Sequence, residues 1–207
     1  MQPPGSRSRV ASQMNVDSPS ILIVGAGAVG AFFGSALARQ GARVSVVCRC
    51  DYESVARDGY HIRSSLLGDH QFRPHAVLRE VAANKTPPDY LLLTVKVLQG
   101  VDRAALIRPA IGPQTVIVLI ENGIDIEAEI ATAFPNNELL SSLAFIGVSR
   151  SARGEIHHQS VGSLIVGRYP SGITPAAQAL AALFEASKVG CKLTYMEIGR
   201  ASCRERV

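Results

Sequence analysis

The sequence predicts an α/β protein with a Rossmann-type, doubly wound and mostly parallel sheet, and an antiparallel strand region near its C-terminal side. Two observations lead to this class. Short apolar runs alternate with segments of helical periodicity through Gly- and Pro-containing connections. A glycine-rich loop also separates the first apolar run from the first helical segment. At 207 residues the chain has room for one good-sized domain.

The N-terminal part reads as strand, helix, strand, helix. Residues 21–24 (ILIV) are too few for a helix and predict a buried parallel strand. Residues 28–40 carry apolar side chains at helical spacing, and Gly41 is a natural stop. A second strand is expected at 43–48, and a short helix at 52–58.

The middle of the chain continues the alternation. Residues 59–78 look like a strand and a turn, and the Pro87–Pro88 pair separates them from the next apolar run. We then expect a buried strand at 89–95, a helix at 102–107, a strand at 115–120 and a helix at 124–133.

The pattern changes after Leu139. The stretches LLSSLAFIGVS, GEIHHQS and GSLIVGRY predict three strands joined by tight turns, antiparallel at one side of the sheet. Residues 174–189 predict an amphipathic helix with Thr174 as N-cap and Pro175 in its first turn. The stretch CKLTYM is expected to form the last strand.

The two ends are set apart from the domain, which we place at residues 21–196. Residues 1–20 are rich in Pro, Ser, Gly and Arg and predict a disordered leader. An organelle-targeting peptide is the alternative, although Pro3, Pro4 and Gly5 disfavour an amphipathic helix at its start. Residues 197–207 lack hydrophobic periodicity and are interpreted as a non-native tail, with a natural frayed end as the alternative.

Composition excludes several classes of function. The net charge is +4, and without the two ends 16 basic and 14 acidic side chains remain, too even a balance for binding nucleic acid. Apolar runs are too short for a membrane span. Four cysteines without paired spacing indicate a reduced compartment, so we expect a cytoplasmic protein, with a mitochondrial location left open.

The glycine loop predicts a dinucleotide site. Gly25 allows the tight turn, Gly27 lets the backbone approach a pyrophosphate, and Gly30 lets the helix pack closely on the strand. Free N–H groups of the first helical turn then face the anion. The predicted binding loop comprises Gly25, Ala26, Gly27, Ala28, Val29 and Gly30.

Arg49 predicts which dinucleotide binds. NAD sites carry a carboxylate at the end of the second strand, where it binds the ribose diol, whereas a 2′-phosphate is repelled by that carboxylate and favours a guanidinium. Here that strand ends on Arg49, which indicates NADP(H). Asp51 keeps NAD as the alternative.

Several motifs in order resemble the ketopantoate reductase (2-dehydropantoate 2-reductase) family. They are the glycine loop, VVCRCDYESVARDGYHIRS, DYLLLTVKVLQ, VIVLIENGID and LAFIGVSRSARGEIHHQSVGSLIVG. The resemblance covers about residues 20 to 196, the family's N-terminal NADP-binding half. It implies that Lys96 lies near both cofactor and 2-oxo acid substrate, and that Asn122 binds the nicotinamide-ribose region of NADP(H). We assign Glu121 no role, because the family often has an uncharged residue there.

The resemblance also implies that catalysis needs a second, helical domain. In the family that domain supplies a catalytic lysine in a Trp-x-Lys-Leu-x-x-Asn segment, and this sequence contains no Trp. Lys192–Leu193 lacks the surrounding residues, so we assign no catalytic residue in this chain. No metal is expected, because neighbouring His157 and His158 would point to opposite faces of a strand.

The resemblance thus implies NADPH-dependent reduction of 2-dehydropantoate to (R)-pantoate in pantothenate biosynthesis, with this chain as the cofactor-binding half. One alternative is another NADP-dependent 2-oxo acid or 3-hydroxyacid dehydrogenase of the same plan. The other is a non-catalytic NADP-sensing module. The expected partner is a small 2-oxo acid, and a homodimer of the full-length protein is left open.

Overall fold

The computed structural model describes residues 18–97, 100–121, 123, 125–195 and 198. Its strands are β1 (Ser20–Val24), β2 (Arg43–Val47), β3 (Tyr60–Ser64), β4 (His70–Phe72), β5 (Ala76–Leu78), β6 (Tyr90–Leu93), β7 (Val116–Ile120), β8 (Leu139–Ala152), β9 (Glu155–Arg168) and β10 (Gly190–Leu193). Its helices are α1 (Ala28–Ala38), α2 (Tyr52–Asp58), α3 (Arg103–Ile107), α4 (Glu127–Ala133) and α5 (Pro175–Ala186), with 3₁₀ turns η1 (Val81–Ala83) and η2 (Arg108–Ala110).

All the strands belong to one sheet. Its order is β4-β3-β9-β8-β7-β6-β1-β2-β5, and β10 pairs with β9. Each consecutive pair in the series β2, β1, β6, β7 and β8 is parallel, whereas β8 and β9 form an antiparallel pair. The predicted α/β class, with a parallel sheet and an antiparallel region, is therefore confirmed.

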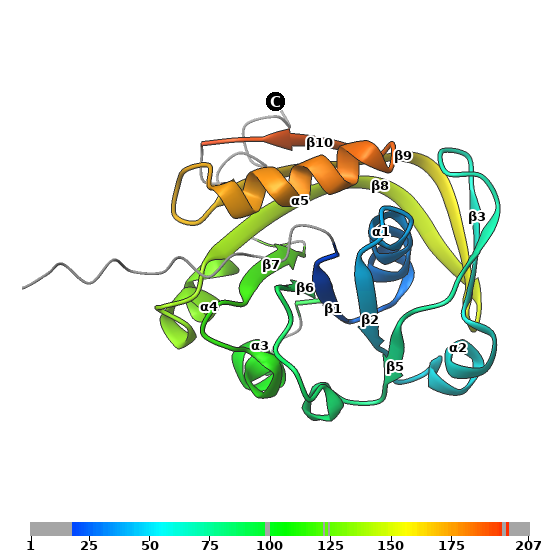
Figure 1. The fold of residues 1–207 in the computed structure, drawn as a ribbon, viewed down its shortest axis with the longest axis horizontal. Coiled ribbons are helices and arrows are strands. Elements are labelled where there is room, and N and C mark those ends of the chain that lie inside the picture. The colour runs from blue at the N-terminus through cyan, green and yellow to red at the C-terminus, as the bar shows by residue number, and fades with distance from the viewer. Residues whose placement is uncertain (1–17, 98–99, 122, 124, 196–197, 199–207) are drawn as a thin grey trace, which may run out of the picture.

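Apolar side chains cover both faces of the central strands of the sheet. Figure 1 shows the long strands β8 and β9 arching over α1, so that α1 is enclosed by the curled sheet. Its Phe32, Phe33 and Leu37 are fully buried there. On the opposite face, Ile107 of α3 and Ile130 of α4 pack into a second core. Both faces of β1, β6 and β7 are thus covered, which explains their uninterrupted apolar sequences.

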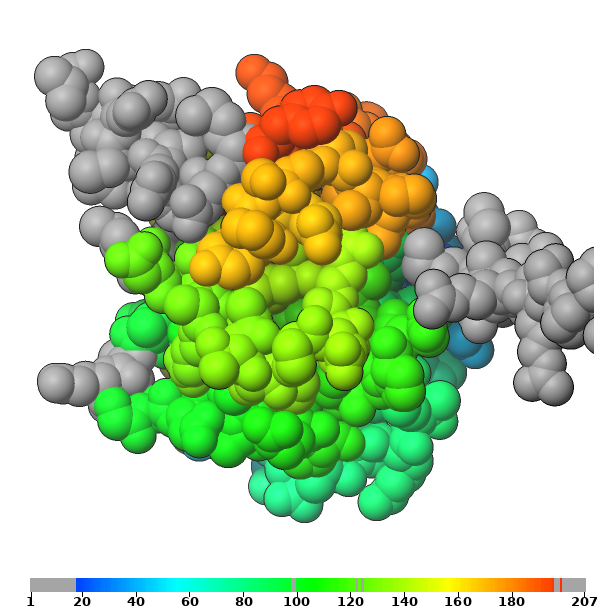
Figure 2. Space-filling model, turned by 90° about the vertical axis from the view of Figure 1, so that its left-hand side faces the viewer, coloured from blue at the N-terminus to red at the C-terminus, as the bar shows by residue number. Residues whose placement is uncertain are grey.

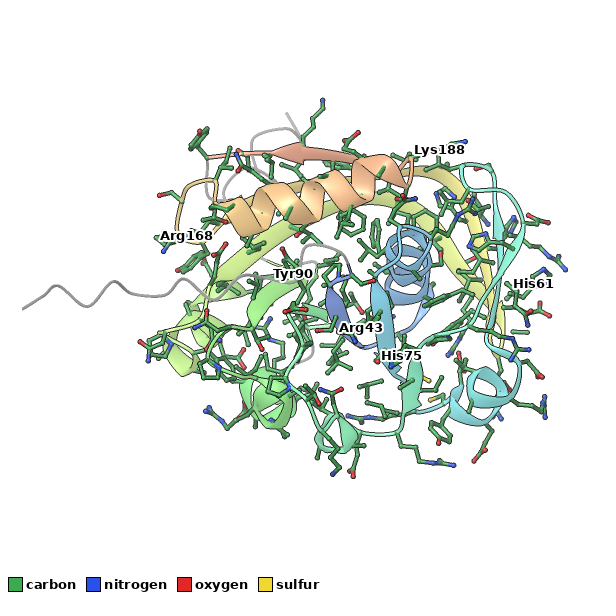
Figure 3. The ribbon with its side chains drawn as sticks, in the orientation of Figure 1. Arg43, His61, His75, Tyr90, Arg168 and Lys188 are labelled. Carbon is green, nitrogen blue, oxygen red and sulfur yellow. The ribbon has the colours of Figure 1, made fainter. Side chains whose placement is uncertain are left out.

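Helix α5 and strand β10 close the C-terminal side. Figure 2, viewed from the left-hand side of Figure 1, shows the orange and red C-terminal residues above the yellow-green residues of the β8 region. Strand β10 pairs with β9, and α5 packs against both of these strands. Thr174 caps α5 as predicted, accepting a 3.1 Å hydrogen bond from the Ala177 N–H. Tyr90, labelled in Figure 3, donates a 3.0 Å hydrogen bond to the Ala176 carbonyl and links α5 to β6. The helix ends at Ala186, three residues before the predicted end at 189.

The antiparallel region differs from the prediction in one respect. The stretches GEIHHQS and GSLIVGRY are one continuous strand, β9, and not two strands joined by a turn. Its pairing with β8 jumps from Phe145 opposite Ser163 to Ile146 opposite Val161. Val161 has φ +61° and Gly162 has φ +108°, so a β-bulge absorbs the extra residue while the strand continues.

The predicted ends of the domain lie largely outside the described residues. Residues 1–17 of the predicted leader are not described, while the Ser18 hydroxyl donates to the Gly41 carbonyl and β1 begins at Ser20. Of the predicted tail at 197–207 only Ile198 is described, and it is buried. Within the described part of the chain, no helix has the length and apolarity needed to cross a membrane.

Candidate dinucleotide-binding site

A cavity of about 630 Å³ opens where β1, β2 and β6 end. This carboxyl edge of the parallel strands is where α/β sheets bind ligands. The basic side chains in its wall are Arg49, Arg79, Lys96 and Arg150. The acidic ones are Asp51 and Glu80, so the wall carries excess positive charge and suits an anion.

The three glycines have the geometry that the sequence predicts. Gly25 has φ +96°, and a Cβ there would lie 2.7 Å from Val95 Cγ1. A Cβ on Gly30 would lie 2.6 Å from Thr94 Oγ1 and 2.9 Å from Ile23 Cγ2, so this glycine permits close packing of α1 on β1. A Cβ on Gly27 would meet nothing nearer than 3.9 Å. Gly27 is therefore the one of these three glycines that the protein's own packing does not require.

Hydrogen bonds from other elements fix the glycine loop. The Thr94 hydroxyl donates to the Gly25 carbonyl at 2.7 Å, and the buried Tyr60 hydroxyl donates to the Ala26 carbonyl at 2.7 Å. The Ala26 N–H in turn donates to the Val47 carbonyl at 3.2 Å. Gly27 is the N-cap of α1, so the N–H groups of Ala28 and Val29 begin a helix that opens on the cavity.

The two predicted basic residues both reach this cavity. Arg49 lies just past β2, and Lys96 lies just past β6. Both side chains are exposed, and neither has a hydrogen-bond or ion-pair partner within the part of the chain that the structure describes. Asn122, the predicted nicotinamide-ribose contact, lies outside the described residues, whereas the neighbouring Gly123 has φ +156°, a conformation that residues with a side chain rarely adopt.

Two arginines in the cavity wall were not expected from the sequence. Arg79 follows β5, lies 4.0 Å above the centre of the Tyr52 ring and pairs with Glu53. Arg150, from β8, holds Asp51 through two 3.0 Å hydrogen bonds. Arg79 follows the edge strand β5 just as Arg49 follows β2, so its place in the cavity wall could have been predicted from the sequence. Arg150 lies 99 residues from its partner, and nothing near it in sequence indicates the contact.

Glu121 is held in a buried ion pair at the end of β7. Its Oε2 accepts a 2.8 Å hydrogen bond from Arg103 Nη1, while Oε1 has no partner among the described residues. Arg103 also binds Glu129 and the Ile126 carbonyl. Burial raises the pKa of Glu121 to about 7, although Arg103 opposes this shift.

The remaining sequence features have structural roles. His157 is exposed and His158 is buried, so they point to opposite faces as predicted. His158 stacks on Phe32 at 4.3 Å between ring centres and contacts the Ser64 hydroxyl through Nδ1. No group of three or more potential metal ligands exists within the described ranges. Lys192 is exposed on β10, in the strand predicted for it.

Comparison with known proteins agrees with this architecture. Residues 21–171 match the family model described as ketopantoate reductase PanE/ApbA. The chain belongs to the ketopantoate reductase family. The predicted family resemblance is therefore confirmed. The family is one of oxidoreductases.

Solved and curated proteins similar to this chain include two that are named 2-dehydropantoate 2-reductase. The solved 2-dehydropantoate 2-reductase of Methylococcus capsulatus is 50% identical with a TM-score of 0.85, covering 90% of this chain and 60% of that one. The 2-dehydropantoate 2-reductase of Nostoc sp. is 28% identical, covering 83% of this chain and 54% of the relative. An uncharacterized protein of Saccharomyces cerevisiae is 33% identical, covering 77% and 51%. The chain thus spans about half the length of these curated relatives.

Proposed function

We propose that this domain binds NADPH and forms the cofactor-binding half of a 2-dehydropantoate 2-reductase. The observation that carries the proposal is the cavity beside the glycine loop. Arg49 and Lys96 line it, and neither has a side-chain partner in the described ranges of the chain. Relatives of the chain carry the reductase name, which supports the same substrate.

The residues in the cavity fit a dinucleotide. The open space beyond Gly27 suits a pyrophosphate, because a side chain at this position would fill space that no protein atom occupies. The N–H groups at the start of α1 would bind that anion. Arg49 would bind the 2′-phosphate, since its guanidinium is exposed at the end of β2 and has no partner among the residues that the structure describes. These contacts favour NADPH over NADH.

Lys96 suits the substrate side of the reaction. Its ammonium group lies past the end of β6, at the same edge as the glycine loop, and would attract an anionic 2-oxo acid to the cofactor. Bound NADPH supplies the hydride that reduces the 2-oxo group. The reaction also needs a general acid for the developing alkoxide, and the family resemblance assigns that group to a helical domain whose Trp-x-Lys segment this sequence lacks.

Calorimetric titration of the chain with NADPH and with NADH tests the proposal. We expect binding of both, with NADPH the tighter ligand, and no oxidation of NADPH at 340 nm when ketopantoate is added. A full-length family member serves as the control for turnover. Absence of nucleotide binding by the folded chain would refute the proposed function, and turnover near that of the control would refute the division between two domains.

A further inference from the structure

Asp51, the acid of the cavity wall that follows Arg49 by two residues, does not face the cavity as a free carboxylate. The Asp51 side chain is only 3% exposed, and both of its oxygens lie 3.0 Å from Nη1 of Arg150. The Arg150 side chain is 47% exposed and lines the same cavity. The ion pair therefore has a buried acidic partner and a basic partner that contacts both Asp51 and the open space.

The fold holds Arg150 in this position from a distance. Arg150 lies near the tip of the β8–β9 hairpin, opposite Ile156. The tip is fixed because β9 also pairs with β3, where His61 is the partner of Glu155. The His61 N–H donates a 2.8 Å hydrogen bond to the Gly154 carbonyl in the turn itself. The hairpin thus places the Arg150 guanidinium beside Asp51 at the end of β2, although Arg150 is distant from β2 in the sequence.

The pairing changes what Asp51 can do to a nucleotide. A free carboxylate at this end of β2 would accept hydrogen bonds from a ribose diol and would repel a 2′-phosphate. In the structure both carboxylate oxygens are engaged, and the charge is balanced by the guanidinium. Arg49 then stands two residues away from a carboxylate whose charge is already balanced.

We propose that Arg150 is a specificity-determining positioning residue, which sets the preference for NADPH by neutralising Asp51. The inference rests on the proposed function, because it concerns the choice between two ligands of the same site. Arg150 acts through Asp51, so its effect must disappear when Asp51 carries no charge. This dependence separates the proposal from a direct contact between Arg150 and the nucleotide.

A double-mutant cycle with Arg150→Met, Asp51→Asn and the double variant tests this dependence. The dissociation constants of NADPH and NADH are measured for the whole chain, and circular dichroism checks that each variant is folded. Arg150→Met exposes the Asp51 charge, so we expect NADPH binding to weaken roughly tenfold or more while NADH binding is retained. Adding Asp51→Asn to that variant should recover most of the lost NADPH affinity.

The comparison of Asp51→Asn with the double variant keeps the test decisive if Arg150→Met alone does not fold. With Asp51 uncharged, loss of Arg150 should leave the ratio of the two dissociation constants nearly unchanged. A further drop in NADPH affinity in the double variant would mean that Arg150 contacts the nucleotide directly, which would overturn the proposal. So would an unchanged ratio in a folded Arg150→Met variant. A wild-type chain that binds neither nucleotide would contradict the proposed function itself.

Discussion

The Thr94 hydroxyl donates a 2.7 Å hydrogen bond to the Gly25 carbonyl and so ties the end of β6 to the glycine loop. The same hydroxyl oxygen lies 2.6 Å from the position that a Cβ on Gly30 would take. One side chain thus contacts two of the three loop glycines, and the loop's shape depends on the neighbouring strand as well as on its own sequence.

Thr94→Val should loosen this connection without changing the volume of the side chain. We expect the free energy of unfolding to fall by about 1 kcal/mol, the usual contribution of one hydrogen bond. NADPH binding should weaken as well, because the loop that positions the pyrophosphate loses an anchor. Urea unfolding and calorimetry measure the two effects, and Thr86→Val, at an exposed position, is the control. Unchanged stability would show that the bond is not significant.

Gly30→Ala should act on folding. Its new methyl group would lie within 3.0 Å of Thr94 Oγ1, Ile23 Cγ2 and the Gly25 carbonyl oxygen, and all three atoms lie outside α1. Overpacking of this kind costs roughly 1–3 kcal/mol of stability. Thermal or urea unfolding would detect this loss, and a variant as stable as the wild type would contradict the close packing of α1 on β1.

Gly27→Val should act on binding. The nearest protein atom to a Cβ at this position is 3.9 Å away, so the folded structure tolerates a side chain. The valine would fill the space assigned to the pyrophosphate, and binding of NADPH and NADH should both be lost. Calorimetry gives the affinity, and a native circular dichroism spectrum excludes unfolding as the cause. Retained affinity would place the pyrophosphate elsewhere.

Glu121 should make stability depend on pH. Burial raises its pKa from 4.5 to about 7, so between these values the folded chain binds a proton that the unfolded chain does not. The contribution of this proton to the free energy of unfolding is fully present below about pH 4.5 and is lost as the pH rises through 7. Relative to Glu121→Gln, which mimics the protonated side chain, the wild type should lose on the order of 2 kcal/mol from pH 5 to pH 8. A difference that stays constant across this range would show that Glu121 remains ionised when folded.

The sequence predicts those parts of the site that follow from the order of strands and loops along the chain. The glycine loop, Arg49 and Lys96 each follow a buried strand directly, and parallel strands bring their ends to one edge, so their meeting in one cavity could be expected. The Asp51–Arg150 pair could not, because it depends on the register of a long hairpin and on the pairing of β9 with β3. The bulge at Val161–Gly162 could not be predicted from the sequence for a related reason. A glycine between two apolar stretches is also typical of a turn, and only the partner strand decides between the two.

The central claim is that this cavity binds a dinucleotide and that Arg49 recognises its 2′-phosphate. The affinities of the Arg49→Ala variant for NADPH and for NADH test this claim most directly. Arg63→Ala removes another exposed arginine, on β3 and outside the cavity wall, and is the matched control. We predict that Arg49→Ala weakens NADPH binding by roughly 1.5–3 kcal/mol, as expected for a charged hydrogen bond, and leaves NADH binding nearly unchanged. Equal losses for both nucleotides, or no loss for NADPH, would contradict the account.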